Sequence, residues 1–155
     1  MKTAGSALAA LIFSGGLTLW ASTRINDPTG FVTEVYRHFV EAQSTGRSYT
    51  PPEDIYTEAL RKLFQHDKKQ AKGEVGCLDF VFWVNAQDWT LTNLSVTAGA
   101  ASQDRTTVIA RFANLGTPQE IQFDFRRIAG RWLLDDARSA KDPRWTLSEI
   151  LRCSP

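Results

Sequence analysis

Residues 107–135 read TVIARFANLGTPQEIQFDFRRIAGRWLLD, and the pattern in these residues indicates the fold class. Apolar and polar side chains alternate along three runs, with the period of two that is typical of a β-strand buried on one face. The apolar sets of the three runs are Val108, Ala110 and Phe112, then Ile121, Phe123 and Phe125, then Trp132 and Leu134. The sequence therefore predicts three half-buried strands in succession.

The turns between these runs predict how the strands pair. Ala129-Gly130 is suited to a two-residue hairpin turn, which would place Arg127 opposite Trp132, Phe125 opposite Leu134 and Phe123 opposite Asp136. A four-residue loop at residues 115–118 would place Phe112 opposite Ile121, Ala110 opposite Phe123 and Val108 opposite Phe125. Both registers bring the large apolar side chains to one face, whereas a slip by one residue would expose them to water.

An earlier strand around residues 89–96 carries a change of parity. Trp89 and Leu91 fall on one parity, whereas Leu94 and Val96 fall on the other. One extra residue in the strand explains this switch, so we expect a β-bulge near Thr92-Asn93 and a curved antiparallel sheet.

Helical periodicity precedes the strands and follows them. Asp27-Pro28 has the character of an N-cap followed by a first helical residue, and apolar residues then recur at helical spacing to about Ser44. A second helix is predicted over residues 53–64, ended by the polar run 66–73, and a short closing helix over residues 145–151. Two N-terminal helices packed on a curved antiparallel sheet, with a short C-terminal helix, make an α+β domain over residues 22–155.

Residues 1–21 have the shape of a secretory signal peptide. Lys2 gives a positive start, an apolar run is interrupted by Gly15-Gly16, and Ala21 is a suitable cleavage residue. The run is too short and too interrupted for a stable membrane span; the alternative is a buried N-terminal helix. Without Lys2 the acidic and basic side chains are equal in number, so no overall field favours nucleic acid. The sequence predicts export to the periplasm or beyond.

The two cysteines, Cys77 and Cys153, both lie in the predicted exported part. An oxidising compartment favours a disulfide between them, and the alternative is two buried free thiols. His38 and His66 have no ligand spacing to either cysteine, so no metal site and no cofactor are expected.

Two short motifs carry a family resemblance. Residues 130–136 read GRWLLDD, and Leu78-Asp79-Phe80 leads to residues 85–89, which read NAQDW. Together they resemble an uncharacterised bacterial family of exported proteins, a domain of unknown function. The resemblance implies a cystatin-like cone, also called nuclear-transport-factor-like, in which a strongly curved sheet wraps around helices; it implies no activity.

Candidate site residues follow from the predicted cone. Asp136 at its rim could be a base or a ligand acceptor, although such an Asp more often receives backbone N–H groups, and Tyr36 points inward from the first helix. The residues expected to line a pocket are Phe31, Val35, Phe112, Phe123, Phe125, Trp132 and Leu134.

Charged residues away from the predicted pocket fit structural roles. On the outer face Asp124 would oppose Asp135, with Arg111 nearby in an arginine–carboxylate cluster, and Arg127 would stack on Trp132. Five basic residues within residues 61–72, namely Arg61, Lys62, Lys68, Lys69 and Lys72, are typical of a solvated helix face.

These observations favour a non-catalytic binding or interaction protein of the bacterial envelope. Its partner would be another envelope protein or a small apolar ligand. One alternative is an immunity or inhibitor protein against a secreted toxin. The other is an enzyme of the ketosteroid-isomerase kind that uses Asp136 and Tyr36, and this alternative predicts an open, partly polar cavity.

Overall fold

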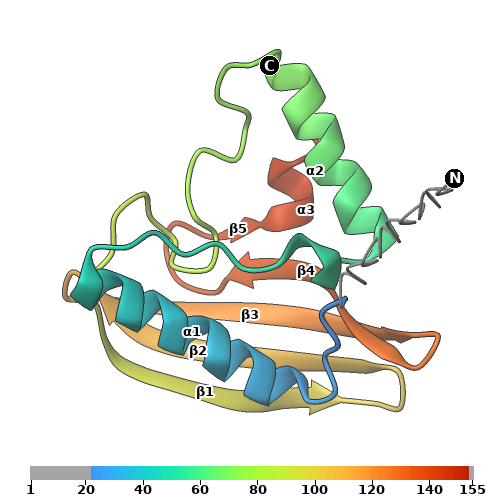
Figure 1. Ribbon diagram of the computed structural model, residues 1–155, viewed down its shortest axis with the longest axis horizontal. Helices are drawn as coiled ribbons and strands as arrows, with labels where there is room; N and C mark the ends of the chain where they lie inside the picture. The colour runs from blue at the N-terminus through green and yellow to red at the C-terminus, as the bar shows by residue number, and fades with distance from the viewer. Residues whose placement is uncertain (1–21, 154–155) are drawn as a thin grey trace, which may run out of the picture.

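The computed structural model describes residues 22–153, so the predicted signal peptide lies outside the described residues (Figure 1). Two helices are followed by a five-stranded antiparallel sheet and a short C-terminal helix, which confirms the α+β class. The elements are α1 (Pro28–Thr45), η1 (Glu53–Ile55), α2 (Glu58–Ala71), β1 (Leu91–Ala101), β2 (Arg105–Asn114), β3 (Thr117–Ile128), β4 (Arg131–Ser139), β5 (Trp145–Thr146) and α3 (Leu147–Ile150). The strands follow one another across the sheet in chain order.

Helix α1 forms as its capping signals predict. The Asp27 side chain accepts a hydrogen bond from the Thr29 N–H at 3.0 Å, Pro28 follows in the first turn, and Gly46 ends the helix at φ 67°. The apolar stripe of α1 is buried against β1 and β2, the strands it crosses in Figure 1.

The second helix differs from the prediction at both ends. Residues 53–64 were expected to form one helix, but η1 ends at Ile55 and α2 begins only after Thr57, whose hydroxyl caps the Leu60 N–H at 3.3 Å. The break arises because the Thr57 N–H donates to the Leu134 carbonyl at 2.9 Å, which ties this backbone to β4. At its far end α2 continues through the polar run to Ala71. Lys and Gln have a high helix propensity, so they extend the helix although the apolar pattern has ended.

The hairpin between β3 and β4 has the predicted turn but an unpredicted bulge. Ala129 and Gly130 have φ values of 49° and 75°, as a two-residue type I′ turn requires, and Phe125 faces Leu134. A register shift after Asp124 then pairs Phe123 with Ala137, so the predicted pairing of Phe123 with Asp136 is wrong. The same shift places Asp124 opposite Asp136, where Asp135 was predicted.

The hairpin between β2 and β3 is tighter than predicted. Its loop is the two residues Leu115 and Gly116, with φ values of 49° and 83°, and the expected four-residue loop is wrong. Phe112 therefore faces Gln119, while Ile121 faces Ala110. Because this change of register is two residues, the parity is kept and the apolar side chains still share one face.

The bulge in β1 is confirmed. The pairing of β1 with β2 shifts between Thr92 and Ser95, and Asn93 has a φ of 53°. At the other end of the sheet, Trp145 and Thr146 form strand β5 and helix α3 begins at Leu147, so the predicted closing helix is shorter at its start.

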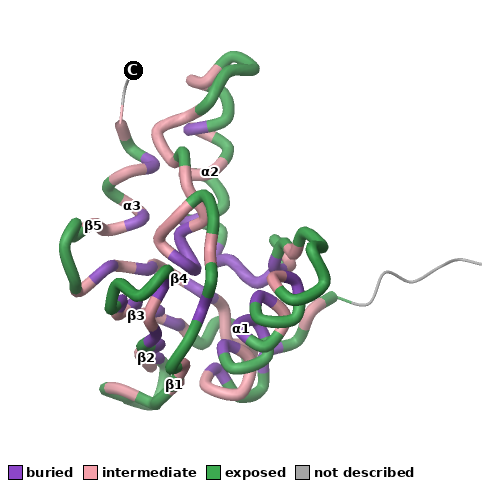
Figure 2. Tube along the Cα trace, turned by 90° about the vertical axis from the view of Figure 1, so that its left-hand side faces the viewer, coloured by how far each residue is buried: buried purple, intermediate pink, exposed green. Residues whose placement is uncertain are grey.

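The core lies between α1 and the sheet and is filled by aromatic side chains. Trp83 comes from the irregular segment between α2 and β1, and its ring stacks on Phe123 with centroids 4.5 Å apart. The Tyr36 ring lies 5.3 Å from that of Phe112. Buried residues follow the inner side of α1 and the facing strands in Figure 2. Helices α2 and α3 contact β4, and α2 extends away from the sheet (Figure 1).

Candidate functional site

The seven residues predicted to line a pocket lie in or against this core. Val35, Phe112, Phe123, Phe125 and Leu134 are buried, while Phe31 and Trp132 are half-buried and pack against the core. Of the seven residues, Phe125 alone contributes to the walls of four hollows on the surface of residues 22–153.

Tyr36 points inward as predicted, and its hydroxyl is used by the fold. The side chain is buried, and the hydroxyl donates a hydrogen bond to the Trp83 carbonyl oxygen at 2.5 Å. Desolvation raises the Tyr36 pKa well above its ordinary value, because burial disfavours the phenolate. The phenol therefore stays protonated and anchors the segment that carries Trp83.

Asp136 is likewise engaged in structural hydrogen bonds. Its carboxylate accepts from the Ser148 N–H at 3.0 Å, from the Ser148 hydroxyl at 2.6 Å and from the Ala137 N–H at 2.9 Å. Ser148 lies in the first turn of α3, where backbone N–H groups lack helical partners. Asp136 thus ties the start of α3 to β4, the bonding pattern that the sequence favoured for it.

The outer face of the sheet carries arginine–carboxylate pairs with different partners from those expected. Asp124 pairs with Arg138 and accepts from the Thr107 hydroxyl at 2.7 Å, whereas Arg111 pairs with Glu120 at 2.8 Å. The neighbour predicted for Asp124, Arg111, is therefore wrong. The Arg127 guanidinium does lie over the Trp132 ring, 6.0 Å from its centroid.

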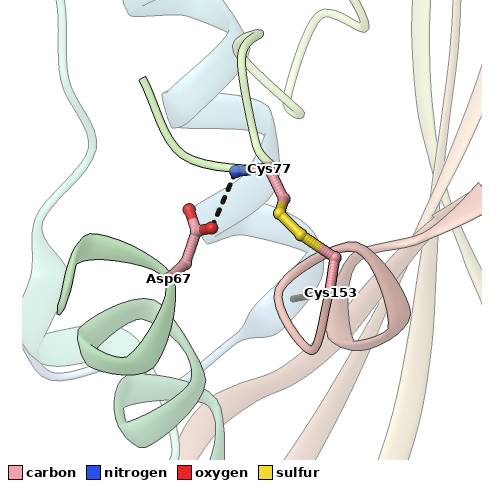
Figure 3. A group of neighbouring side chains, drawn as sticks. All are labelled: Asp67, Cys77 and Cys153. Carbon is pink, nitrogen blue, oxygen red and sulfur yellow. Dashed lines mark hydrogen bonds between the residues drawn. A yellow bond between two sulfur atoms is a disulfide. The ribbon is translucent and has the colours of Figure 1, made fainter. Parts of the chain in front are cut away.

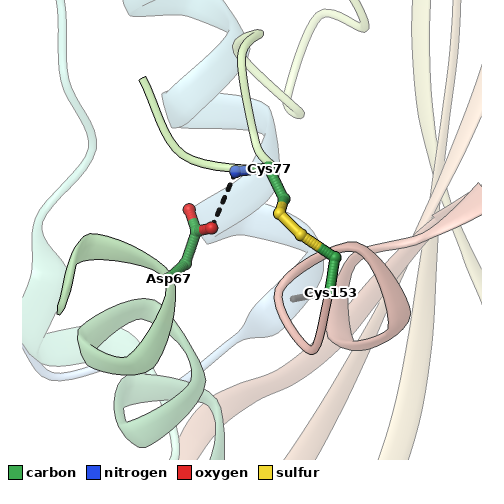
Figure 4. The surroundings of a disulfide bond; sticks show 3 residues. All are labelled: Asp67, Cys77 and Cys153. Carbon is green, nitrogen blue, oxygen red and sulfur yellow. Dashed lines mark hydrogen bonds between the residues drawn. A yellow bond between two sulfur atoms is a disulfide. The ribbon is translucent and has the colours of Figure 1, made fainter. Parts of the chain in front are cut away.

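Cys77 and Cys153 form the predicted disulfide, which joins two segments 76 residues apart in sequence (Figure 4). The buried Asp67 carboxylate of α2 accepts a hydrogen bond from the Cys77 N–H at 2.8 Å (Figure 3). The two sulfurs and this carboxylate lie within 4.8 Å of one another. With both sulfurs in the disulfide, no thiolate is available to a metal in this state.

A groove of about 530 Å³ runs along α2 and is the candidate site; we call it the α2 groove. It is lined by Thr50, Pro51, Glu53, Tyr56, Arg61, Phe64, Gln65, Asp67, Lys68 and Leu78. Four of these residues, Arg61, Phe64, Gln65 and Lys68, follow the i, i+3, i+4, i+7 spacing of a single helix face. Helix α2 therefore forms one side of the groove, and residues 50–56 with Leu78 complete its lining.

The α2 groove has an aromatic surface beside its polar groups. The rings of Tyr56 and Phe64 stack with centroids 5.0 Å apart. Phe64 also contacts the core residue Phe82, and the centroids of these two rings are 6.3 Å apart. Desolvation raises the pKa of Tyr56 to about 12, because burial disfavours the phenolate. The Tyr56 hydroxyl is therefore neutral at physiological pH, so the rings offer an uncharged surface to a ligand.

Some charged side chains near the α2 groove form ion pairs with other side chains, and others do not. Lys62, outside the groove, pairs with Glu58 at 2.7 Å, whereas Arg61 and Lys68 make no ion pair within the described residues 22–153. Asp67 already accepts from the Cys77 N–H. The groove lining thus holds two exposed cations without an ion pair and two carboxylates, of which Glu53 is exposed and Asp67 is buried.

The other three hollows offer less to an apolar ligand. The largest of them, about 490 Å³, lies where β1, β2, β3 and β4 meet and contains Asp124 and Asp136, both engaged as described. A hollow of about 480 Å³ lies at Trp145 and Arg138, and one of about 420 Å³ lies at the end of α1.

The sequence prediction missed the α2 groove. It interpreted the basic residues of residues 61–72 as one solvated face, although the interval of seven between Arg61 and Lys68 places them on one side with Phe64. That spacing was the available signal. Much of the remaining lining comes from residues 50–56, and no local pattern in the sequence shows that these residues lie beside α2.

Comparisons with models of protein families, with curated proteins and with solved structures find no match to this chain. The resemblance to the exported family stays a prediction. Among the described residues, no helix has the length and apolar character needed to cross a membrane.

Proposed function

We propose that this chain is a non-catalytic binding domain of the bacterial cell envelope and that the α2 groove is its ligand site. The observation that carries this proposal is the stacked pair Tyr56 and Phe64 in the wall of a groove of about 530 Å³. Ligand sites are typically concave and apolar, with a few polar groups that orient the ligand.

Two further observations support binding over catalysis. The isomerase alternative needs Tyr36 and Asp136 to converge on one substrate atom, but the Tyr36 hydroxyl is bonded to Trp83 and the Asp136 carboxylate to Ser148. The space between α1 and the sheet holds stacked aromatic rings, so this alternative lacks the cavity that it requires.

An envelope location is supported by the disulfide and by the signal-like residues 1–21. Disulfides form and persist in oxidising compartments, of which the bacterial periplasm is one. The resemblance to an exported family points in the same direction.

The groove is tested with N-phenyl-1-naphthylamine, an uncharged aromatic probe whose fluorescence rises in apolar sites. We expect saturable binding that Phe64→Ala weakens by about tenfold, the value of one lost aromatic contact. Leu115→Ala is the matched control, because Leu115 is an exposed apolar residue in the β2–β3 turn and does not line the groove. Binding that is absent, or equally weakened in both variants, would contradict the proposal.

A further inference from the structure

One face of helix α2 has an aromatic ring between two cations, and this combination indicates a class of ligand. Arg61 and Lys68 are seven residues apart, about 10 Å along the helix, and Phe64 and Gln65 lie between them on the same face. Arg61 and Lys68 therefore lie about one helical turn before and after Phe64 on this face of α2. We infer that the α2 groove binds an organic anion, a compound with a flat apolar body and one carboxylate or sulfonate group.

Charge availability supports an anion over a neutral ligand. In the described part of the chain, neither Arg61 nor Lys68 is neutralised by a protein carboxylate within 4.0 Å. Of the two acidic residues in the lining, Asp67 is buried and bonded to the Cys77 N–H. Asp67 is therefore the buried carboxylate of the lining, whereas the charges exposed to solvent are those of Arg61, Lys68 and Glu53. An incoming anion thus meets two exposed cations and one exposed carboxylate.

The aromatic pair Tyr56 and Phe64 would bind the apolar body of the ligand. Tyr56 and Phe64 are held in their stack by the core, since Tyr56 is buried at 8% exposure and Phe64 contacts Phe82. A rigid aromatic surface loses little conformational entropy on binding. An arginine guanidinium next to such a surface binds carboxylate or sulfonate oxygens through two parallel N–H donors.

This inference rests on the proposed function, and its test uses two probes that share one ring system. The first probe is 8-anilinonaphthalene-1-sulfonate, which carries one negative charge, and the second is its uncharged analogue N-phenyl-1-naphthylamine. We expect the sulfonate to bind wild-type protein about tenfold more tightly than the neutral probe, and we expect this advantage to shrink as salt is added.

Charge-matched double variants separate the groove from the general field of α2. The variant Arg61→Gln/Lys68→Gln should lose the preference for the sulfonate and keep its affinity for the neutral probe within about twofold. The variant Lys62→Gln/Lys69→Gln removes the same charge from the same helix outside the groove lining and should keep the preference. Glu53→Gln should strengthen sulfonate binding, because it removes the opposing carboxylate.

The outcomes distinguish this inference from the proposal beneath it. If neither probe depends on Phe64, the groove is not a ligand site and the proposed function fails. If the neutral probe depends on Phe64 but the sulfonate gains nothing from Arg61 and Lys68, the groove binds neutral ligands and the anion inference is overturned. Equal loss in both double variants also overturns it. Circular dichroism of each variant guards against binding to a partly unfolded chain, which takes up the sulfonate probe non-specifically.

Discussion

Two tyrosines show how burial determines what one side chain can do. The Tyr36 hydroxyl donates a hydrogen bond to the Trp83 carbonyl, whereas the Tyr56 ring lines the α2 groove. Desolvation raises the pKa of both, to about 12 for Tyr56, so neither phenol supplies a base at neutral pH. The sequence places both residues on apolar faces, but the partner of the Tyr36 hydroxyl is a carbonyl 47 positions away.

The raised pKa of Tyr56 predicts a loss of stability at high pH. The unfolded chain loses the Tyr56 proton near pH 10.0, whereas the folded chain holds it to about pH 12, so the Tyr56 contribution is complete below pH 10 and declines between these values. Tyr56→Phe keeps the ring and removes the titration. We expect the stability difference between wild type and variant to be constant below pH 10.0 and to fall by roughly 1 kcal/mol for each pH unit above it.

Urea unfolding followed by tryptophan fluorescence measures both proteins across this pH range. Other titrating groups are common to the two proteins and cancel in the difference. Parallel stability curves over the whole range would show that Tyr56 is not desolvated in the folded chain.

Among the elements, those whose signals are local agree best with the sequence. Helix α1 has its cap, proline and apolar stripe within one segment, and the bulge in β1 follows from the parity of four residues. The predictions of the start of α2 and of the register of β4 were wrong, because contacts with other segments determine both. Thr57 bonds to Leu134 across the chain, and the bulge after Asp124 coincides with the ties of Asp136 to Ser148 and of Asp124 to Arg138.

The β2–β3 hairpin predicts a stabilising substitution. Leu115 adopts a φ of 49° and is 69% exposed, so it bears the cost of a left-handed backbone without the benefit of burial. Asn tolerates this conformation well, and Asn-Gly is a strong type I′ pair. We expect Leu115→Asn to raise the free energy of unfolding by about 1 kcal/mol, measured by urea denaturation.

Leu115→Val provides the opposite test at the same position. A β-branched residue is strained at positive φ, so this variant should be less stable than wild type. If Asn and Val change stability equally, the turn does not have the backbone conformation described here.

At the scale of the whole molecule, periodicity predicts the inner face of the sheet but not what covers it. Val108, Ile121, Phe123 and Leu134 are all buried, as their alternation indicates. The segment of residues 72–90 has neither helical nor strand period, yet it supplies Trp83 to the centre of the core and Leu78 to the α2 groove. A contact between Trp83 and Phe123, 40 residues apart, leaves no periodic trace in the sequence.

The disulfide connects this irregular segment to Cys153. The stability of the fold therefore depends on whether the compartment is oxidising. A bridge across 76 residues removes enough freedom from the unfolded chain to stabilise the fold by about 4 kcal/mol. We expect full-length protein expressed in a Gram-negative bacterium to reach the periplasm, begin near Ser22 and have an intact mass about 2 Da below that of the dithiol.

The same chain without residues 2–21, made in a reducing cytoplasm, should carry free thiols and unfold at lower urea concentration. Cys77→Ser/Cys153→Ser, purified from the periplasm, should match the stability of the reduced protein, because it lacks the cross-link in an otherwise identical fold. Retention of residues 1–21 would contradict export with cleavage, and free thiols in the periplasmic protein would contradict the oxidised state. These two readouts are independent, so cleavage without the bridge would overturn the link between compartment and stability while leaving export intact.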